Sequence, residues 1–146
     1  MKPIHRTILV SHGWHRAQID VGIADLILTC WKCGISTLYS CQGGDSLGRG
    51  GDRRSDAYIQ FPQVEDVTKF LAYVAFKRSD NPTSLYVRTG TQVYPGFFVP
   101  GGYRPWQFSA RAEDISGPED APIFDFRVAV TFPPSDIPRM QKALEN

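Results

Sequence analysis

Apolar residues recur at helical spacing between positions 23 and 31, and this periodicity constrains the fold most strongly. The stripe follows the i, i+3, i+4, i+7, i+8 pattern of an amphipathic helix and consists of Ile23, Leu26, Ile27, Cys30 and Trp31. Asp20 precedes the stripe as a candidate N-cap, and Gly34 follows it as a residue suited to the left-handed conformation of a helix end. The sequence therefore predicts a helix from about 20 to 33.

Shorter periodic segments surround this helix. A second helical stripe is formed by Val64, Val67, Leu71 and Val74. Four segments favour strands, at 6–11, 36–41, 57–61 and 84–88. The order strand, helix, strand, strand, helix, strand is typical of the split βαβ core of ferredoxin-like folds, in which both helices cover one sheet face. We therefore expect an α+β fold with a ferredoxin-like core over about 6–90.

The C-terminal third should extend this core. The segments Trp106–Arg111 and Phe124–Phe132 alternate between apolar and polar residues, which predicts two half-buried strands. A helix should follow them, with Ser135 as its cap. No long linker or repeat interrupts the chain, so residues 1–146 are expected to form a single domain with a strand, strand, helix extension over about 104–146.

Charge and composition narrow the possible partners. The chain has 146 residues, and its 16 basic and 15 acidic side chains leave a formal charge of +1. This balance provides no global field for phosphate backbones, so nucleic acid would be bound only through local contacts. The sequence has no apolar run long enough for a membrane span and no signal-peptide core, and its three cysteines favour reduced thiols. We expect a cytoplasmic protein without a membrane partner.

Two histidines and two cysteines have the spacing of a zinc motif. They are arranged as His-x2-His and Cys-x2-Cys, at His12, His15, Cys30 and Cys33. Cys30, however, lies on the apolar stripe of the predicted helix, where a small buried thiol is an ordinary core residue. The cysteine pair also ends the helix, whereas redox pairs normally begin one. Core packing is the favoured interpretation, and we expect no metal and no other cofactor.

A glycine-rich segment, residues 42–54, follows the strand predicted at 36–41. Its five glycines would let backbone N–H groups approach an anion. The segment begins with Gln42 and contains three arginines that could bind phosphate or carboxylate oxygens, namely Arg49, Arg53 and Arg54. It is not a P-loop, because no Gly-Lys-Ser/Thr follows. Three nearby aspartates balance the arginines, so a solvated loop is the alternative to an anion site.

Alternation along the predicted strands places aromatic side chains on one face of the sheet. If Leu38, Ile59 and Leu85 face the helices, the opposite face carries Tyr39, Cys41, Tyr58, Tyr86 and Arg88. Such a face can stack nucleobases or other planar groups. Alternatively, the C-terminal extension covers the tyrosines with its own apolar faces. The sequence leaves both possibilities open.

Two further features offer alternative functions. The connection 93–103 is dense in glycine, proline and aromatic residues, and it could contact a partner protein or pack into the core. His15 and Cys41 would form a base and nucleophile pair if the fold brought them together, with His12 nearby. Classical hydrolase, zinc-protease and dinucleotide motifs are missing from the sequence. An enzyme acting on RNA or a nucleotide is thus the alternative to a binding protein.

The stretch Gly34–Gly43 reads Gly-Ile-Ser-Thr-Leu-Tyr-Ser-Cys-Gln-Gly. Together with Asp20–Ile27 and Ala57–Phe61, it resembles small, uncharacterised proteins of actinobacteria and their phages that carry a G-I-x-T-x-x-S-C-Q-G motif. The resemblance covers about 20–75 and implies a bacterial or phage origin. The run Ser40-Cys41-Gln42-Gly43-Gly44 is also similar to the Ser-Cys-Ser-Gly-Arg run of a wybutosine-synthesis tRNA methyltransferase family, although the arginine is absent here.

We therefore expect a non-enzymatic binding protein for a nucleotide-like or other anionic ligand. Its site should lie where the 36–41 strand enters the glycine-rich segment, with tyrosines for stacking and arginines for anionic groups. The predicted ligand-binding residues are His15, Tyr39, Cys41, Gln42, Arg49, Arg53, Arg54, Tyr58, Tyr86 and Arg88, and no catalytic residue is assigned. The resemblance to phage proteins suggests a counter-defence role. The second alternative is an inhibitor that binds a host protein through 93–103.

Overall fold

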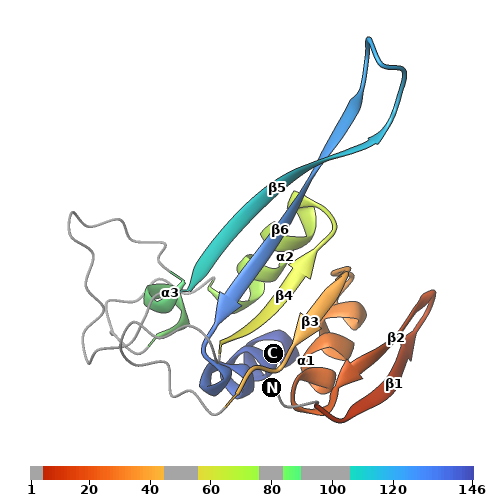
Figure 1. Cartoon of the computed structure of the whole chain (residues 1–146). Coiled ribbons are helices and arrows are strands. Elements are labelled where there is room, and N and C mark those ends of the chain that lie inside the picture. Colours follow the sequence, from red (N-terminus) through yellow and green to blue (C-terminus); the bar gives the residue numbers. More distant parts are fainter. Residues whose placement is uncertain (1–4, 45–55, 76–83, 90–105) are drawn as a thin grey trace.

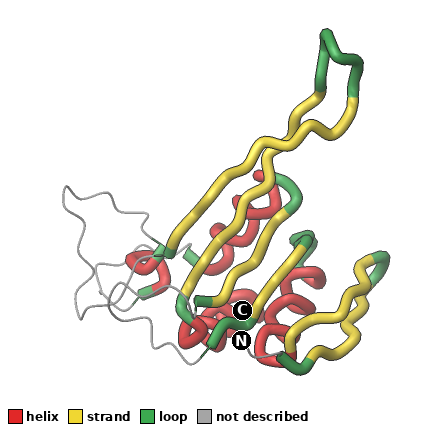
Figure 2. The backbone as a smooth tube through the Cα atoms, in the orientation of Figure 1, coloured by secondary structure: helices red, strands yellow, loops and turns green. Residues whose placement is uncertain are grey.

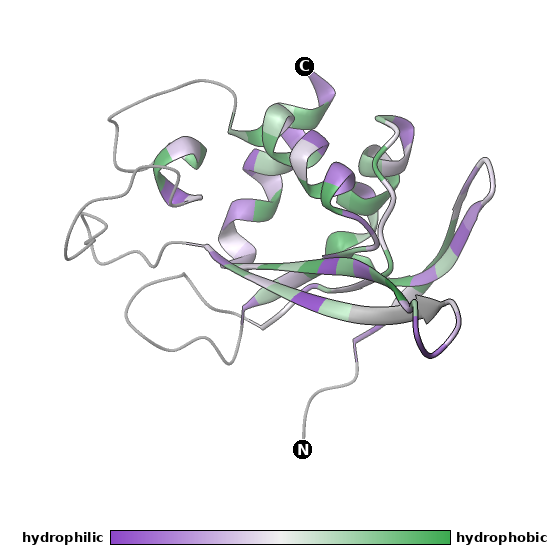
Figure 3. Ribbon diagram, turned by 90° about the horizontal axis from the view of Figure 1, so that it is seen from above, coloured by the Kyte–Doolittle hydropathy of each residue, from purple (hydrophilic) through white to green (hydrophobic). Residues whose placement is uncertain are grey.

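The computed structural model describes residues 5–44, 56–75, 84–89 and 106–146, which form a mixed α/β fold (Figure 1). These residues form one sheet of two strands and one sheet of four strands, and both are antiparallel. The longer helices gather on one face of the larger sheet, as the view from above shows (Figure 3). None of the described helices combines the length and apolar character that a membrane span requires.

The first two strands form a hairpin beside the first helix. Strand β1 (Thr7–His12) pairs with β2 (His15–Asp20), and two residues connect them. The first of the two, Gly13, has a φ of 60°, as the first central position of a type II′ turn requires. Val10 and Ile19 bury the inner face of the hairpin in the core. Strand β1 was predicted, but β2 was not.

Helix α1 (Val21–Lys32) confirms the strongest prediction from the sequence. All five residues of the predicted stripe are buried. Gly34 ends the helix with a φ of 78°, and the N–H of Ile35 donates to the carbonyl of Cys30 at 2.9 Å, which closes a Schellman-type turn. Asp20 occupies the N-cap position, but its side chain makes no capping hydrogen bond. This carboxylate instead belongs to the site described below.

The larger sheet has the strand order β3-β4-β6-β5. Its strands are β3 (Tyr39–Cys41), β4 (Ala57–Phe61), β5 (Gln107–Ser116) and β6 (Ile123–Phe132). Ala57, Ile59 and Phe61 are fully buried on the helix-facing side of β4, as their alternation predicted. The C-terminal strands therefore join the edge of the sheet beside β4. They do not cover the face that carries Tyr39 and Tyr58.

Two longer helices and one short helix complete the described fold. Helix α2 (Val64–Val74) matches the second helical stripe, and α4 (Ile137–Glu145) follows a 3₁₀ turn at Pro134–Asp136. The strand predicted at 84–88 is wrong, because this segment forms helix α3 (Leu85–Arg88). The hydroxyl of Ser84 accepts from the N–H of Val87 at 3.2 Å and caps the helix.

The ferredoxin-like arrangement is not confirmed. A split βαβ core would place the first and last predicted strands inside the main sheet. The structure instead places β1 in a separate hairpin and forms a helix at 84–88. The extension predicted over 104–146 supplies half of the four strands, which pair in antiparallel fashion throughout.

The hairpin of β5 and β6 projects beyond the helix layer (Figure 2). Near Val130 and Phe132 the inner face of β6 is fully buried, whereas Phe124 and Phe126 on the same face are exposed. Alternation along the strand therefore continues past the point where the helices cover it. The far end of this hairpin forms an arm with exposed aromatic side chains.

Candidate functional site

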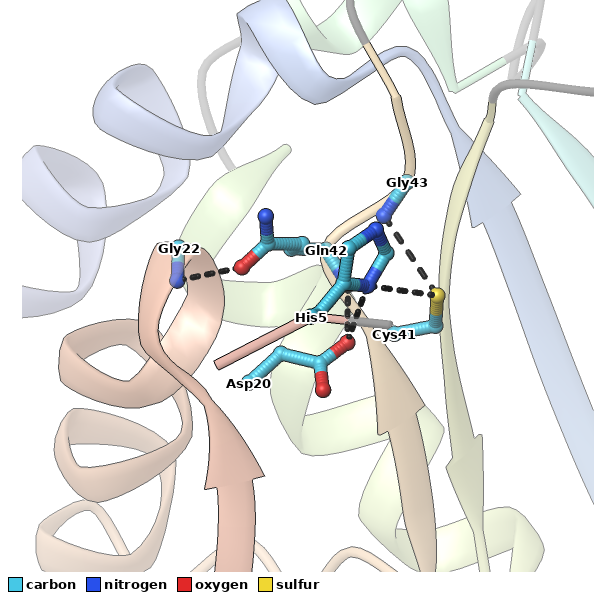
Figure 4. Close-up of polar contacts among 6 residues, drawn as sticks. All are labelled: His5, Asp20, Gly22, Cys41, Gln42 and Gly43. Carbon is cyan, nitrogen blue, oxygen red and sulfur yellow. Dashed lines mark hydrogen bonds and ion pairs between the residues drawn. The ribbon is translucent and has the colours of Figure 1, made fainter. Parts of the chain in front are cut away.

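Three side chains from separate segments meet where β3 ends (Figure 4). His5 precedes β1, Asp20 ends β2, and Cys41 ends β3. The Nδ1 atom of His5 lies 2.9 Å from Oδ2 of Asp20 and 3.9 Å from Sγ of Cys41. The three candidate ligand atoms lie within 4.8 Å of one another, and all three residues are half-buried. We call these residues the His5–Asp20–Cys41 cluster.

Backbone groups of the next two residues point into the cluster. The N–H of Gln42 donates to Oδ2 of Asp20 at 3.1 Å. The N–H of Gly43 lies 3.5 Å from Sγ of Cys41. Gly43 has a φ of 73°, a left-handed conformation in which glycine carries no steric cost. The turn after β3 thus directs two N–H donors at the oxygen and sulfur atoms of the cluster.

The side chain of Gln42 connects this turn to the first turn of α1. Its Oε1 atom accepts a hydrogen bond from the N–H of Gly22 at 2.6 Å. The N–H groups of a first helical turn have no partner within the helix, so Gln42 satisfies one of them from outside. Its Nε2 atom donates to none of the described residues and is thus available to a ligand.

A pocket of about 250 Å³ lies next to this turn. One wall is formed by Gly22, Gln42, Gly43 and Gly44, and the opposite wall is formed by Pro134, Ile137 and Pro138. The pocket therefore has a polar side made of backbone groups and an amide, and an apolar side made of two prolines and an isoleucine. It lies where β3 enters the glycine-rich segment, and Gln42 is the predicted ligand residue in its lining.

Two predicted stacking residues lie on the open face of the sheet. Tyr58 stands directly opposite Cys41 in the pairing of β3 with β4, and Tyr39 stands opposite Gln60. Both tyrosines are exposed, Tyr39 at 63% and Tyr58 at 40%. Partial burial raises the pKa of the Tyr58 phenol, and the negative charges of Cys41 and Asp20 raise it further. Tyr58 therefore remains a neutral hydroxyl at physiological pH beside the cluster.

Two other predicted ligand residues do not lie on this face. Tyr86 and Arg88 belong to α3 and not to a strand, so the alternation that placed them outward does not apply. Arg88 is 3% exposed, and its Nε atom donates to Oδ2 of Asp136 at 2.8 Å. This arginine stabilises the core and does not bind a ligand at the open face. Arg49, Arg53 and Arg54, and the 93–103 connection, lie outside the described residues.

His15 is not close to Cys41, contrary to its assignment as a ligand residue. It begins β2, about 17 Å along the strand from Asp20. Its ring is stacked between Trp14 and Trp31, with centroid distances of 3.8 Å and 5.0 Å, and its Nε2 lies 3.1 Å from the hydroxyl of Ser36. The histidine beside Cys41 is His5, which belongs to no periodic pattern or motif of the sequence.

The residues of the His-x2-His and Cys-x2-Cys motif do not form a site. Cys30 is fully buried, and this burial raises the pKa of its thiol far above the usual range, with a smaller contribution from Cys33. The thiol of Cys33 donates to the carbonyl of Leu144 at 3.6 Å. Among the residues that the structure describes, the close group of potential metal ligands is the His5–Asp20–Cys41 cluster.

Comparison of the chain with family models, with curated proteins and with solved structures gave no match.

Proposed function

We propose that the chain is a cytoplasmic, non-enzymatic protein that binds a nucleotide-like or other small anionic ligand at the turn after β3. The pocket beside Gln42 is the observation that carries this proposal. Ligand sites are typically concave, with apolar walls and a few polar groups that fix orientation. The two walls of this pocket have that composition.

The partial charges of two helix N-termini at the pocket favour an anion. Gly22 is the second residue of α1, and Ile137 and Pro138 are the first two residues of α4. A helix N-terminus carries a positive partial charge, and two of them border the same pocket. The N–H of Gly22 is already bound to Gln42, so the donor available to a ligand is Nε2 of Gln42.

The volume of the pocket limits what it can hold. Pockets for drug-sized ligands measure roughly 300–1,000 Å³, and this one is smaller. It would accommodate one part of a nucleotide, such as a base or a phosphoribosyl group. The rest of the glycine-rich segment, which contains Arg49, Arg53 and Arg54, follows Gly44 in the sequence, so these arginines are the proposed partners for the remaining anionic groups.

Native mass spectrometry and isothermal titration calorimetry test this proposal. The protein as purified should carry a mass increment of a few hundred daltons that disappears on denaturation. The stripped protein should bind a nucleoside monophosphate more tightly than the corresponding nucleoside or inorganic phosphate. If neither a copurified ligand nor binding of these three probes is detected, the proposal is wrong.

Gln42→Glu is the most informative variant. It keeps an oxygen that accepts from Gly22, but it replaces the amide donor with a negative charge. Binding of the monophosphate should weaken at least about 10-fold, since a charged hydrogen bond of roughly 1.5–3 kcal/mol is replaced by repulsion. Gln60→Glu, on the open face of β4, is the matched control and should bind as the wild type does.

A second candidate, suggested by the His5–Asp20–Cys41 cluster beside the pocket, is an enzyme that acts on a nucleotide or RNA and requires Cys41 for turnover. Cys41→Ala would then abolish turnover of the bound ligand and leave its affinity nearly unchanged. If the chain is instead a binding protein, the ligand should be recovered chemically intact from both the wild type and Cys41→Ala.

The proposed counter-defence role rests on the resemblance to phage proteins. The other alternative is an inhibitor that binds a host protein through 93–103. Capture of a host protein by the wild type, and its loss on deletion of 93–103, would favour the inhibitor.

A further inference from the structure

We infer that the His5–Asp20–Cys41 cluster is a binding site for a zinc ion. The site would hold the metal with one imidazole nitrogen, one carboxylate oxygen and one thiolate (Figure 4). This inference goes beyond ligand binding in the neighbouring pocket and does not depend on it.

The separations within the cluster are close to those of a tetrahedral zinc site. Zinc binds nitrogen and oxygen at about 2.0–2.2 Å and sulfur at about 2.3 Å, so its ligand atoms lie roughly 3.3–3.7 Å apart. Here Nδ1 of His5 lies 2.9 Å from Oδ2 of Asp20 and 3.9 Å from Sγ of Cys41. Small rotations of half-buried side chains would bring all three atoms to ligand distance.

The orientation of His5 favours a metal site over a nucleophile and base pair. In a relay of thiol, imidazole and carboxylate, the thiol faces one ring nitrogen and the carboxylate faces the other. In this cluster both Sγ of Cys41 and Oδ2 of Asp20 face the same atom, Nδ1. One ring nitrogen cannot accept a proton from the thiol while it donates one to the carboxylate. A cation between the three atoms satisfies all of them.

The surroundings of the cluster resemble the outer shell of a metal site. Ligating carboxylates and thiolates are commonly held by hydrogen bonds from neighbouring groups. The N–H of Gln42 holds Asp20, and the N–H of Gly43 points at the sulfur of Cys41. Asp20 occupies an N-cap position and yet makes no capping bond, so its carboxylate is directed to the cluster.

The ligand set selects the class of metal. A thiolate and an imidazole favour zinc over magnesium or calcium, which prefer oxygen ligands throughout. Three protein ligands leave one tetrahedral position for a water molecule or an atom of a bound molecule. This arrangement differs from the closed four-ligand sites that only stabilise a fold.

The experiment uses the tag-free chain of residues 1–146, stripped with a chelator and kept reduced with a phosphine. Zinc is titrated against a chromophoric competitor, and native mass spectrometry gives the stoichiometry. The wild type should bind one zinc ion per chain. Cys41→Ser and His5→Ala should each weaken zinc binding by more than about 100-fold, above the roughly 10–100-fold loss usually seen for outer-shell changes.

Matched controls use the other members of the sequence motif. Cys33→Ser and His12→Ala remove a thiol and an imidazole elsewhere in the fold and should retain full affinity. Circular dichroism establishes that each variant is folded. Cobalt substitution provides an independent readout, because the thiolate-to-cobalt absorption band should be present in the wild type and in Cys33→Ser and absent in Cys41→Ser. Failure of the wild type to bind stoichiometric zinc, or unchanged affinity in folded Cys41→Ser, overturns the inference.

Discussion

The N–H of Gly22 and Oε1 of Gln42 are joined by a hydrogen bond of 2.6 Å, which links the first turn of α1 to the residue that follows β3. The bond is possible because residue 22 has no side chain. A Cβ atom at this position would lie 2.7 Å from Oε1 and 3.1 Å from Cβ of Gln42. Gly22 therefore permits the approach on which the polar wall of the pocket depends.

Gly22→Ala should cost about 0.5–1.5 kcal/mol for the lost hydrogen bond, so that it removes most of the helix preference of alanine over glycine, which is up to about 1 kcal/mol. The reason is that Gln42 must move away and the hydrogen bond is lost. Urea unfolding measures the change. In a Gln42→Ala background most of the obstruction is gone, so the same substitution should be neutral or stabilising. Additive effects in this double-mutant cycle would contradict the relationship.

A second prediction concerns the buried pair of Arg88 and Asp136. Oδ2 of Asp136 accepts from Nε of Arg88 and from Nε1 of Trp106, each at 2.8 Å. Asp136→Ala leaves the arginine charge buried beside an unpaired indole N–H, so the free energy of unfolding should fall by about 3–5 kcal/mol. Asp125→Ala, on the exposed part of β6, is the control and should change it by less than about 0.5 kcal/mol. Equal effects would show that the pair does not stabilise the core.

The alkaline stability of the protein should depend on Cys30. Burial raises the pKa of this thiol far above its usual value of 9.0 in the folded state. The unfolded chain therefore releases the proton first, so the stability that the neutral thiol contributes is fully present below pH 9 and is lost as pH rises above it. This group alone should lower the free energy of unfolding by roughly 1.4 kcal/mol per pH unit.

Urea unfolding at pH 7, 9, 10 and 10.5 provides the measurement. Above pH 9 the free energy of unfolding should fall less steeply with pH in Cys30→Ala than in the wild type, by roughly 1.4 kcal/mol per pH unit. This difference in slope does not depend on the stability of the variant at pH 7. In Cys33→Ala the contribution of Cys30 should persist, because burial is the main cause of the raised pKa. Parallel curves for the wild type and Cys30→Ala would show that the thiol is accessible in the folded protein.

The periodicity of apolar residues was sufficient to predict the helices and strands that have a long buried face. Helix α1 and strands β4 and β6 were predicted to within about two residues, because their apolar residues repeat over several turns or pleats. Strand β2 was missed, since only Ile19 of its residues His-Arg-Ala-Gln-Ile-Asp is buried. The sequence of the short segment 84–88 is compatible with a strand as well as a helix. In the structure it is a helix, and the hydrogen bond from the N–H of Val87 to the hydroxyl of Ser84 caps it.

The candidate site was predicted only in part. Cys41 and Gln42 were assigned because they end a predicted strand and begin a glycine-rich segment. His5 and Asp20 lie 36 and 21 positions before Cys41 in the sequence, and a local sequence pattern cannot predict contacts between residues so far apart. Asp20 was interpreted as a helix cap, which its position allows, and the hydrogen bonds of the folded chain show a different partner. Arg88 was assigned to the open face because residues 84–88 were given the two-residue period of a strand, whereas they form helix α3.

The last prediction compares two phenylalanines on the same face of β6. Phe132 is fully buried and its ring lies 5.5 Å from that of Trp106, whereas Phe126 lies on the projecting arm and is 51% exposed. Phe132→Ala should therefore reduce the free energy of unfolding by about 3–5 kcal/mol, and Phe126→Ala by less than about 0.5 kcal/mol. Urea unfolding of the two variants measures the difference. Comparable losses would mean that the arm is covered in solution, for example by a second copy of the chain, which the concentration dependence of unfolding would reveal.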